Sequence, residues 1–178
     1  MKRGFFLLST LIPCLLLAQT QHIVRPNATD PNSDSPNNNH YAYVEPGISP
    51  KNKLFLFLPG TGGNPFHYRK ILKVAANLGY HSIGLTYPNS LAINLLCLAS
   101  LDTTCHSRAR LEIFDGTDRH NGISVDTSNS IWHRTRKLLQ YLDSQYPGEN
   151  WGQYIQADTV LWNQVIIGGH SQGGGHAG

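Results

Sequence analysis

One short segment near the C-terminus has a residue pattern that suits nucleophilic catalysis. Gly169-His170-Ser171-Gln172-Gly173 matches Gly-X-Ser-X-Gly, in which a serine sits on a strained turn between a strand and a helix. The flanking positions are small because larger side chains would collide with the strand and the helix. A serine presented in this way could attack the acyl carbon of an ester. The five letters alone are weak evidence in a chain with 17 glycines, so the surrounding elements decide the interpretation.

The elements around this segment are predicted to alternate between strands and helices. Apolar runs at 54–58 and 160–167 predict two buried strands, and the second leads directly into the serine turn. Between them, Asn64 and Pro65 can begin a helix, which Gly79 would end, and residues 80–87 predict a further strand. The apolar positions of this helix are Tyr68, Ile71, Leu72, Ala75 and Leu78. Residues 130–146 predict a second long helix with Asn129 as its cap. The pattern favours the α/β class with a parallel crossover.

A glycine-rich loop follows the first predicted strand. In Pro59-Gly60-Thr61-Gly62-Gly63, the backbone N–H of Thr61 or Gly62 could join that of Gln172 around a developing negative charge. A phosphate-binding loop is the alternative, but the segment lacks Gly-Lys-Ser/Thr and does not complete Gly-X-Gly-X-X-Gly. No three-ligand zinc spacing is present either. We therefore predict neither a cofactor nor a metal.

These two motifs resemble those of the α/β-hydrolase superfamily, specifically its secreted lipase- and esterase-like members, over residues 54–178. The resemblance implies an incomplete α/β-hydrolase fold, with a parallel sheet flanked by helices. It also implies Ser171 as the nucleophile, within an elbow formed by Gly169, His170 and Gly173. Thr61 and Gln172 would supply the oxyanion donors. The implied activity is hydrolysis of carboxylic esters through an acyl-enzyme.

The family order of nucleophile, acid and histidine is not completed by this chain. Seven residues follow Ser171, and His176 is expected to point along the helix that leaves the turn. An upstream triad would have to combine Asp115, Asp118 or Asp126 with His106, His120 or His133. We expect residues 51–178 to be the N-terminal part of a longer hydrolase domain. Such a fragment would be inactive alone and would aggregate through its open strand edge. The alternative is a secreted, non-catalytic binding module.

The loops from 89 to 129 are compatible both with an ester hydrolase and with a non-catalytic binding module. This segment contains Arg108, Arg110 and Glu112, and we expect it to cover the top of the sheet or to contact the substrate. It also contains Cys97 and Cys105, which we predict to form a disulfide in an oxidising compartment. Closing this loop is worth about 2.5 kcal/mol in the chain-entropy model.

The N-terminal part predicts export from the cytoplasm. Residues 1–18 combine Lys2 and Arg3 with a 14-residue apolar run, which is typical of a secretory signal peptide. We therefore predict a secreted or periplasmic protein. Residues 19–50 are rich in Pro, Asn, Ser and Asp and predict a flexible linker. A short strand at 41–44 is the one exception.

Composition excludes several partner classes. Of 178 residues, 40% are hydrophobic and 14% are charged, which suits one packed domain. The net charge of +3 falls to +1 without Lys2 and Arg3, so no basic surface is expected for nucleic acid. No membrane span is predicted, because the apolar run is shorter than the about 20 residues that a span needs. The expected partner is a small-molecule or polymer ester; the sequence predicts no oligomeric state.

Overall fold

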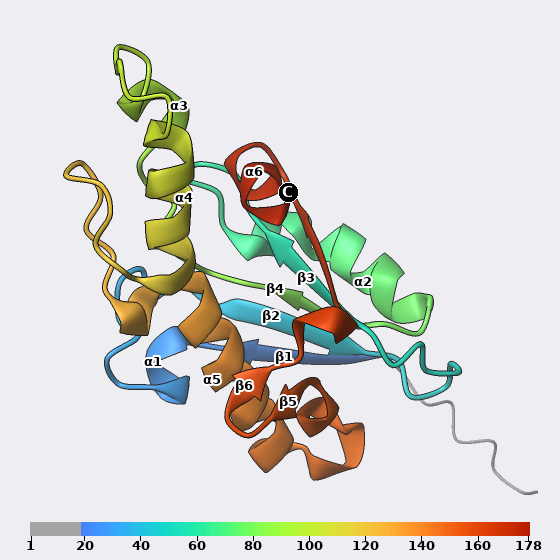
Figure 1. The fold of residues 1–178 in the computed structure, drawn as a ribbon. Helices are drawn as coiled ribbons and strands as arrows, with labels where there is room; N and C mark the ends of the chain where they lie inside the picture. The colour runs from blue at the N-terminus through green and yellow to red at the C-terminus, as the bar shows by residue number, and fades with distance from the viewer. Residues whose placement is uncertain (1–18) are drawn as a thin grey trace, which may run out of the picture.

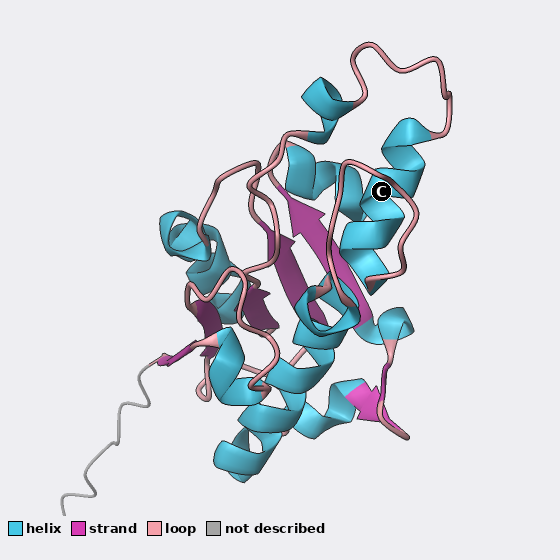
Figure 2. Cartoon of the chain, turned by 90° about the vertical axis from the view of Figure 1, so that its left-hand side faces the viewer, coloured by secondary structure: helices cyan, strands magenta, loops and turns pink. Residues whose placement is uncertain are grey.

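A computed structural model describes residues 19–178 as an α/β fold around one mixed five-stranded sheet (Figures 1 and 2). The strands lie in the order β1-β2-β4-β3-β7. They span Thr20–Val24 (β1), His40–Val44 (β2), Leu54–Leu58 (β3), His81–Gly84 (β4) and Val165–Gly169 (β7). A separate hairpin pairs Ile155–Gln156 (β5) with Thr159–Val160 (β6). The predicted signal peptide, 1–18, lies outside the described residues.

The sheet confirms the α/β class but is parallel in only one half. β3 pairs in parallel with β4 and with β7, whereas β1–β2 and β2–β4 are antiparallel. The prediction of a parallel sheet is therefore wrong for the β1–β2 half. Between β1 and β2 the chain forms only one short helix, Pro26–Thr29 (α1), and no long crossover helix returns it in the parallel direction.

The prediction of a flexible linker over residues 19–50 is wrong. This segment supplies β1 and β2, and Ala42 and Tyr43 are almost fully buried. Composition misled because each strand has only five residues and several of its buried groups are polar, including His22 and His40. The short strand expected at 41–44 is confirmed as β2.

Helices cover the sheet largely where their periodicity predicted them. The first forms as a 3₁₀ turn, Pro65–Tyr68, followed by Arg69–Asn77 (α2). The Asn64 side chain caps the turn by accepting a hydrogen bond from Phe66 N–H (2.9 Å). The prediction of the buried face of this helix is only partly correct. Leu72, Ala75 and Ala76 are buried, whereas Ile71 and Leu78 are exposed.

The second long helix, Ile131–Gln145 (α5), forms as expected, with Leu138, Leu139 and Leu142 in the core. Its cap is Ser130, not Asn129: the Ser130 hydroxyl accepts a hydrogen bond from His133 N–H (3.2 Å). The final helix of the described chain, Gln172–Ala177 (α6), follows β7 and contains His176, as expected.

The 89–129 segment is more ordered than its sequence indicated. It forms Ile93–Leu96 (α3) and Cys105–Asp115 (α4), which stand together above one end of the sheet (Figure 1). The predicted disulfide between Cys97 and Cys105 is confirmed and links the end of α3 to the start of α4. The sequence did not indicate α4 because its buried face includes the polar residue Glu112.

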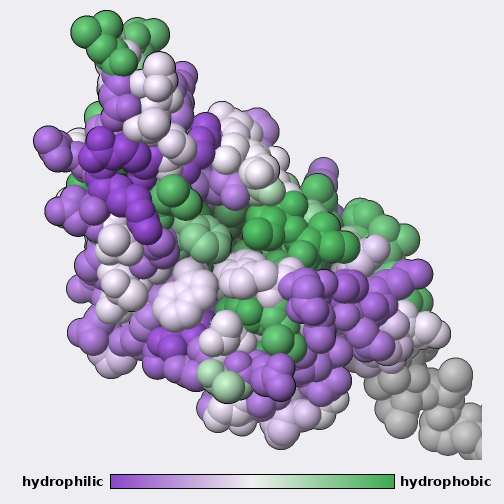
Figure 3. All heavy atoms as spheres, in the orientation of Figure 1, coloured by the Kyte–Doolittle hydropathy of each residue, from purple (hydrophilic) through white to green (hydrophobic). Residues whose placement is uncertain are grey.

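Strand β7 forms one edge of the described sheet. It begins at Val165, five residues later than the predicted strand, and among the described strands it pairs only with β3. Ile166 is half-exposed and lies with Ile71, Val74 and Leu78 of the α2 region around an apolar hollow. Figure 3 shows apolar surface gathered on this side of the molecule. The described residues therefore leave both an open strand edge and apolar surface here.

Histidines whose pKa is lowered in the folded state make stability depend on pH; two of them are the buried His40 and the partly buried His176. Burial, with a smaller effect of Arg134, lowers the pKa of His40 well below its usual value. Its Nδ1 accepts a hydrogen bond from Thr86 N–H (3.0 Å), which protonation would break. Burial, with a smaller effect of Arg110, lowers the pKa of His176 to about 4. Both imidazoles are therefore neutral in the folded state at pH 5.

We expect the free energy of unfolding to fall between pH 7 and pH 5, by about 2 kcal/mol for the contribution of His176, whose folded pKa is about 4. Below pH 6.5 the unfolded chain binds protons at these sites and the folded chain does not, so stability decreases as the pH falls. Urea unfolding at pH 7, 6 and 5 measures the slope. His40→Gln should reduce it, whereas His67→Gln, which changes an exposed histidine, should not. Equal slopes in the two variants would contradict the assignment.

Candidate active site

Ser171 occupies a sharp turn between β7 and α6. Its backbone has φ 52° and ψ −118°, a positive-φ conformation outside the regions that a residue with a side chain normally adopts, and therefore a costly one. The residue is exposed at the end of β7. Strain of this kind persists only where the surrounding structure enforces it, and it concentrates at functional sites.

Two glycines of the motif allow this turn. A Cβ at Gly169 would lie 2.3 Å from the carbonyl carbon of Gly173. A Cβ at Gly173 would lie 2.0 Å from the carbonyl oxygen of Leu58, at the end of β3. Backbone atoms cannot move aside cheaply, so the turn packs against β3 only when both positions lack side chains.

The glycine-rich loop after β3 lies beside the serine. A Cβ at Gly60 would approach the Ser171 Cβ to 3.1 Å and His170 Nδ1 to 3.0 Å. The loop is held by two residues that sequence reasoning did not assign to the site. Tyr87 Oη donates to the Pro59 carbonyl (2.6 Å), and Asn89 Nδ2 donates to the carbonyls of Gly60 (2.7 Å) and Gly63 (2.9 Å). Both residues follow β4, and only the sheet order, with β4 beside β3, brings them to this loop.

The three backbone donors considered for an oxyanion differ in their hydrogen bonds. Gly62 N–H donates to the Asn89 carbonyl (2.8 Å) and is therefore occupied. Within residues 19–178, no acceptor is bonded to the N–H of Thr61 or of Gln172. The geometry favours Thr61 and Gln172 over Gly62 as free donors.

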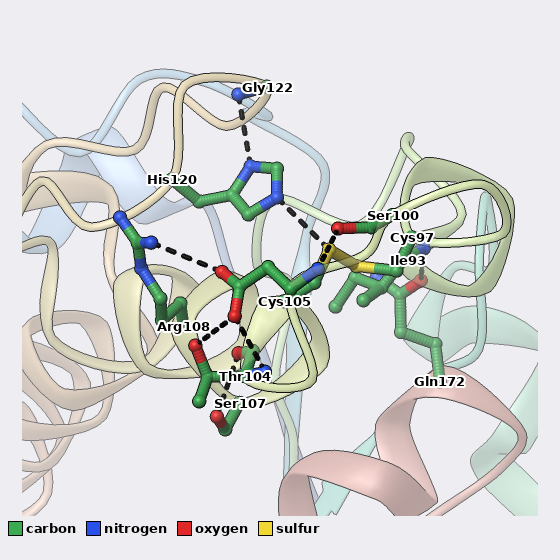
Figure 4. The surroundings of a disulfide bond; sticks show 11 residues. Ile93, Cys97, Ser100, Thr104, Cys105, Ser107, Arg108, His120, Gly122 and Gln172 are labelled. Carbon is green, nitrogen blue, oxygen red and sulfur yellow. Dashed lines mark hydrogen bonds and ion pairs between the residues drawn. A yellow bond between two sulfur atoms is a disulfide. The ribbon is translucent and has the colours of Figure 1, made fainter.

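The side chain of Gln172 connects the segments around the serine. Its Oε1 accepts hydrogen bonds from Thr61 Oγ1 (3.0 Å) and from Ile93 N–H (3.2 Å). Gln172 is buried and reaches from α6 toward α3, as Figure 4 shows. The glycine loop, the serine turn and the α3 wall are thus fixed relative to one another.

A cavity of about 230 Å³ opens at this junction. It contains Ser171 itself and receives residues from the glycine loop, α3, α4 and α6. The lining residues are Thr61, Ile93, Asn94, Arg110, Ser171 and Gln172. The 89–129 segment, which was expected to cover the sheet or contact the substrate, contributes one charged residue to the lining of this cavity, Arg110. Arg108 instead pairs with Asp102 (3.2 Å), and Glu112 accepts hydrogen bonds from two backbone N–H groups, those of Arg119 and His120.

No described histidine is hydrogen-bonded to the Ser171 hydroxyl. His170 Nδ1 is bonded to Tyr68 Oη (2.9 Å), and the ring of His176 packs edge-on against Tyr87 with centroids 5.5 Å apart. The Tyr87 hydroxyl remains protonated, because burial raises its pKa far above the usual value.

Three of the upstream candidates for a triad are engaged elsewhere, and within residues 19–178 neither Asp118 nor His106 is hydrogen-bonded to Ser171. Asp115 binds Arg119, and Asp126 accepts a hydrogen bond from Asn129 N–H (2.9 Å). His133 pairs with Asp30 (2.8 Å). Within residues 19–178, no acid or base is hydrogen-bonded to the Ser171 side chain.

His120 lies at the disulfide. Its Nε2 is 3.2 Å from Cys105 Sγ, and its Nδ1 accepts a hydrogen bond from Gly122 N–H (3.0 Å) (Figure 4). The ligand atoms of Cys97, Cys105 and His120 lie within 4.8 Å of one another. Because the two sulfur atoms are bonded to each other, this cluster is a structural link in the state described.

Comparisons with known proteins found no match among family models, curated proteins or solved structures. Within residues 19–178, none of the helices has the length and apolar character that crossing a bilayer requires.

Proposed function

We propose that Ser171 is the nucleophile of a serine hydrolase that cleaves carboxylic esters through an acyl-enzyme. The observation that carries this proposal is the backbone of Ser171, held at φ 52° and ψ −118° between β7 and α6. The nucleophile elbow of α/β-hydrolases is a strained strand-to-helix turn of this type. The tight backbone packing at Gly169 and Gly173, which leaves no room for a Cβ at either position, also supports a nucleophile elbow.

The neighbouring loop supports an oxyanion site. In the hydrolase arrangement, one donor is the N–H after the nucleophile and the other comes from the loop between the third strand and the next helix. Here those positions are Gln172 and, after β3, Thr61. Each such donor contributes about 3 kcal/mol to transition-state stabilisation.

The reaction then proceeds in two halves. Ser171 Oγ bonds to the acyl carbon, a base takes the hydroxyl proton, and the carbonyl electron pair moves onto the oxygen that the two N–H groups face. Collapse breaks the bond to the alcohol, which leaves with a proton. Water attacks the acyl-enzyme in the same way and releases the acid.

The base is proposed to come from outside residues 19–178. Without it, the serine stays protonated and is a weak nucleophile, so the 178-residue chain is expected to turn over esters poorly. The disulfide between Cys97 and Cys105 supports folding in an oxidising compartment. With the predicted leader, it supports a secreted or periplasmic location.

A fluorophosphonate probe tests the nucleophile directly in the 178-residue chain. Ser171 Oγ displaces fluoride from phosphorus, and without a base we expect slow labelling that accelerates about tenfold per pH unit from pH 7 to 9. The reason is that hydroxide then removes the proton. Peptide mass spectrometry identifies the labelled residue. Ser171→Ala should abolish labelling, whereas Ser90→Ala, which removes an exposed serine beside a neighbouring cavity, should not.

Two results would contradict parts of this proposal. If Ser171 reacts no faster than the other serines at any pH, the turn does not activate its hydroxyl and the hydrolase proposal fails. If labelling or ester turnover reaches a plateau near pH 7, a base is present within the chain.

A non-catalytic binding module is the second candidate. It is supported by the end of α3 and the loop that follows it, where Leu95 of α3 and Leu98 and Leu101 of the loop are exposed by 67%, 79% and 100%. Exposed apolar side chains gathered in one segment are typical of a contact surface. Failure of Ser171 to react would favour this candidate.

A further inference from the structure

Arg110 is the only charged side chain that lines the cavity beside Ser171. It lies on α4, whose first residue is tied to α3 by the disulfide. The other lining residues are uncharged at neutral pH. The cavity therefore presents one positive charge next to the candidate nucleophile.

This charge is not neutralised within the described chain. Arg110 forms no ion pair with an Asp or Glu of residues 19–178. Its one hydrogen bond to protein is long, from Nη1 to the Gln172 carbonyl (3.4 Å). Arg108, two positions earlier, is by contrast paired with Asp102. A guanidinium has five N–H donors, so most of those on Arg110 remain free for a ligand.

Glycine in α6 makes room for this guanidinium. A Cβ at Gly175 would lie 1.9 Å from Arg110 Nη1 and 2.4 Å from its Cζ. The charge also acts on its surroundings, because Arg110 adds to burial in lowering the pKa of His176. The planar group is thus seated against the helix that follows the nucleophile.

We propose that Arg110 selects esters that carry a carboxylate on their acyl or alcohol part. This inference rests on the proposed function and specifies its substrate class. An arginine fork binds a carboxylate through two parallel hydrogen bonds. A single arginine matches the single charge of a carboxylate better than the nearly double charge of a phosphate monoester. A cavity of about 230 Å³ fits a small ester.

Binding of two matched esters tests the inference without requiring catalysis. The 178-residue chain with Ser171→Ala is titrated with monomethyl succinate and with dimethyl succinate, followed by NMR or calorimetry. We expect the anionic ester to bind about tenfold more tightly, since it gains a charge-assisted pair. Adding Arg110→Gln should remove this preference, and Arg110→Lys should restore part of it. Arg108→Gln, on the same helix but outside the cavity, should leave it intact.

The outcomes separate this inference from the hydrolase proposal. Equal binding of the two esters, no binding of either, or a preference that survives Arg110→Gln would overturn the inference. Thermal unfolding and binding of the neutral ester identify any variant that has lost its fold. If Arg110→Gln does not fold, Arg110→Lys tests the inference instead, because it should keep only part of the preference for the anionic ester. If the preference depends on Arg110 but Ser171 does not react with the fluorophosphonate, the anion-binding role of Arg110 is supported and the hydrolase proposal fails.

Discussion

Replacing Gly173 by alanine is expected to destabilise the protein by more than about 3 kcal/mol, the range of severe overpacking. The new Cβ would lie 2.0 Å from the Leu58 carbonyl oxygen, 2.6 Å from its carbon and 2.6 Å from the Pro59 carbonyl oxygen. All three atoms belong to the backbone at the end of β3, a strand paired on both sides. The turn would have to move away from β3, which would also separate Ser171 from the glycine loop.

The adjacent Gly174 provides a matched control. A Cβ there would meet its nearest atom, the Gly169 carbonyl oxygen, at 3.4 Å, which is ordinary contact. Alanine is also a better helix former than glycine by up to about 1 kcal/mol, so Gly174→Ala should be neutral or stabilising. Urea unfolding measures both variants, and fluorophosphonate labelling reports the geometry of the turn. Similar stability of the two variants would show that the turn does not pack on β3 as described.

Replacing Arg134 by methionine should cost about 3–5 kcal/mol, the range for breaking a buried polar network from one side. Arg134 is fully buried on α5. Its guanidinium donates to the carbonyls of Pro36 (2.8 Å) and Thr86 (3.1 Å) and to the Asn129 side chain. Burial lowers its pKa to about 10, so it is charged at neutral pH. Methionine fills much of the volume but removes the donor to the Pro36 and Thr86 carbonyls, whereas Asn129 Oδ1 keeps its hydrogen bond from Ser35 N–H (3.0 Å).

Lys137→Met on the same helix is the control for Arg134→Met. Lys137 is only partly buried and forms no ion pair within residues 19–178, so its loss should change stability by less than about 0.5 kcal/mol. Thermal and urea unfolding compare the two. A loss below about 1 kcal/mol in Arg134→Met would mean that the Pro36 and Thr86 carbonyls find water or other donors.

The elements that the sequence predicted well are those whose information is local. The apolar run of β3, the periodicity of α5 and the turn at Ser171 can each be read from consecutive residues. Strands β1 and β2 could not, because their stability comes from pairing with each other and with β4. Their polar, proline-containing context gave the opposite signal.

The candidate site shows the same division. Ser171, Thr61 and Gln172 follow from two short motifs, and the structure brings them to one cavity. Tyr87 and Asn89 could not be assigned from sequence, because their role is to hold backbone carbonyls more than twenty positions earlier. Pairings of this kind depend on which strands become neighbours, and spacing along the chain does not encode that.

The link between Cys97 and Cys105 makes the shape of the cavity beside Ser171 sensitive to how the polypeptide is produced. Cys97 directly follows α3, whose Ile93 N–H donates to the side chain of Gln172, the residue after Ser171. Expression in a reducing cytosol would free the 98–104 connection while leaving the central sheet untouched. Preparations that look well folded by circular dichroism could then differ in ligand affinity, and thiol titration would distinguish them.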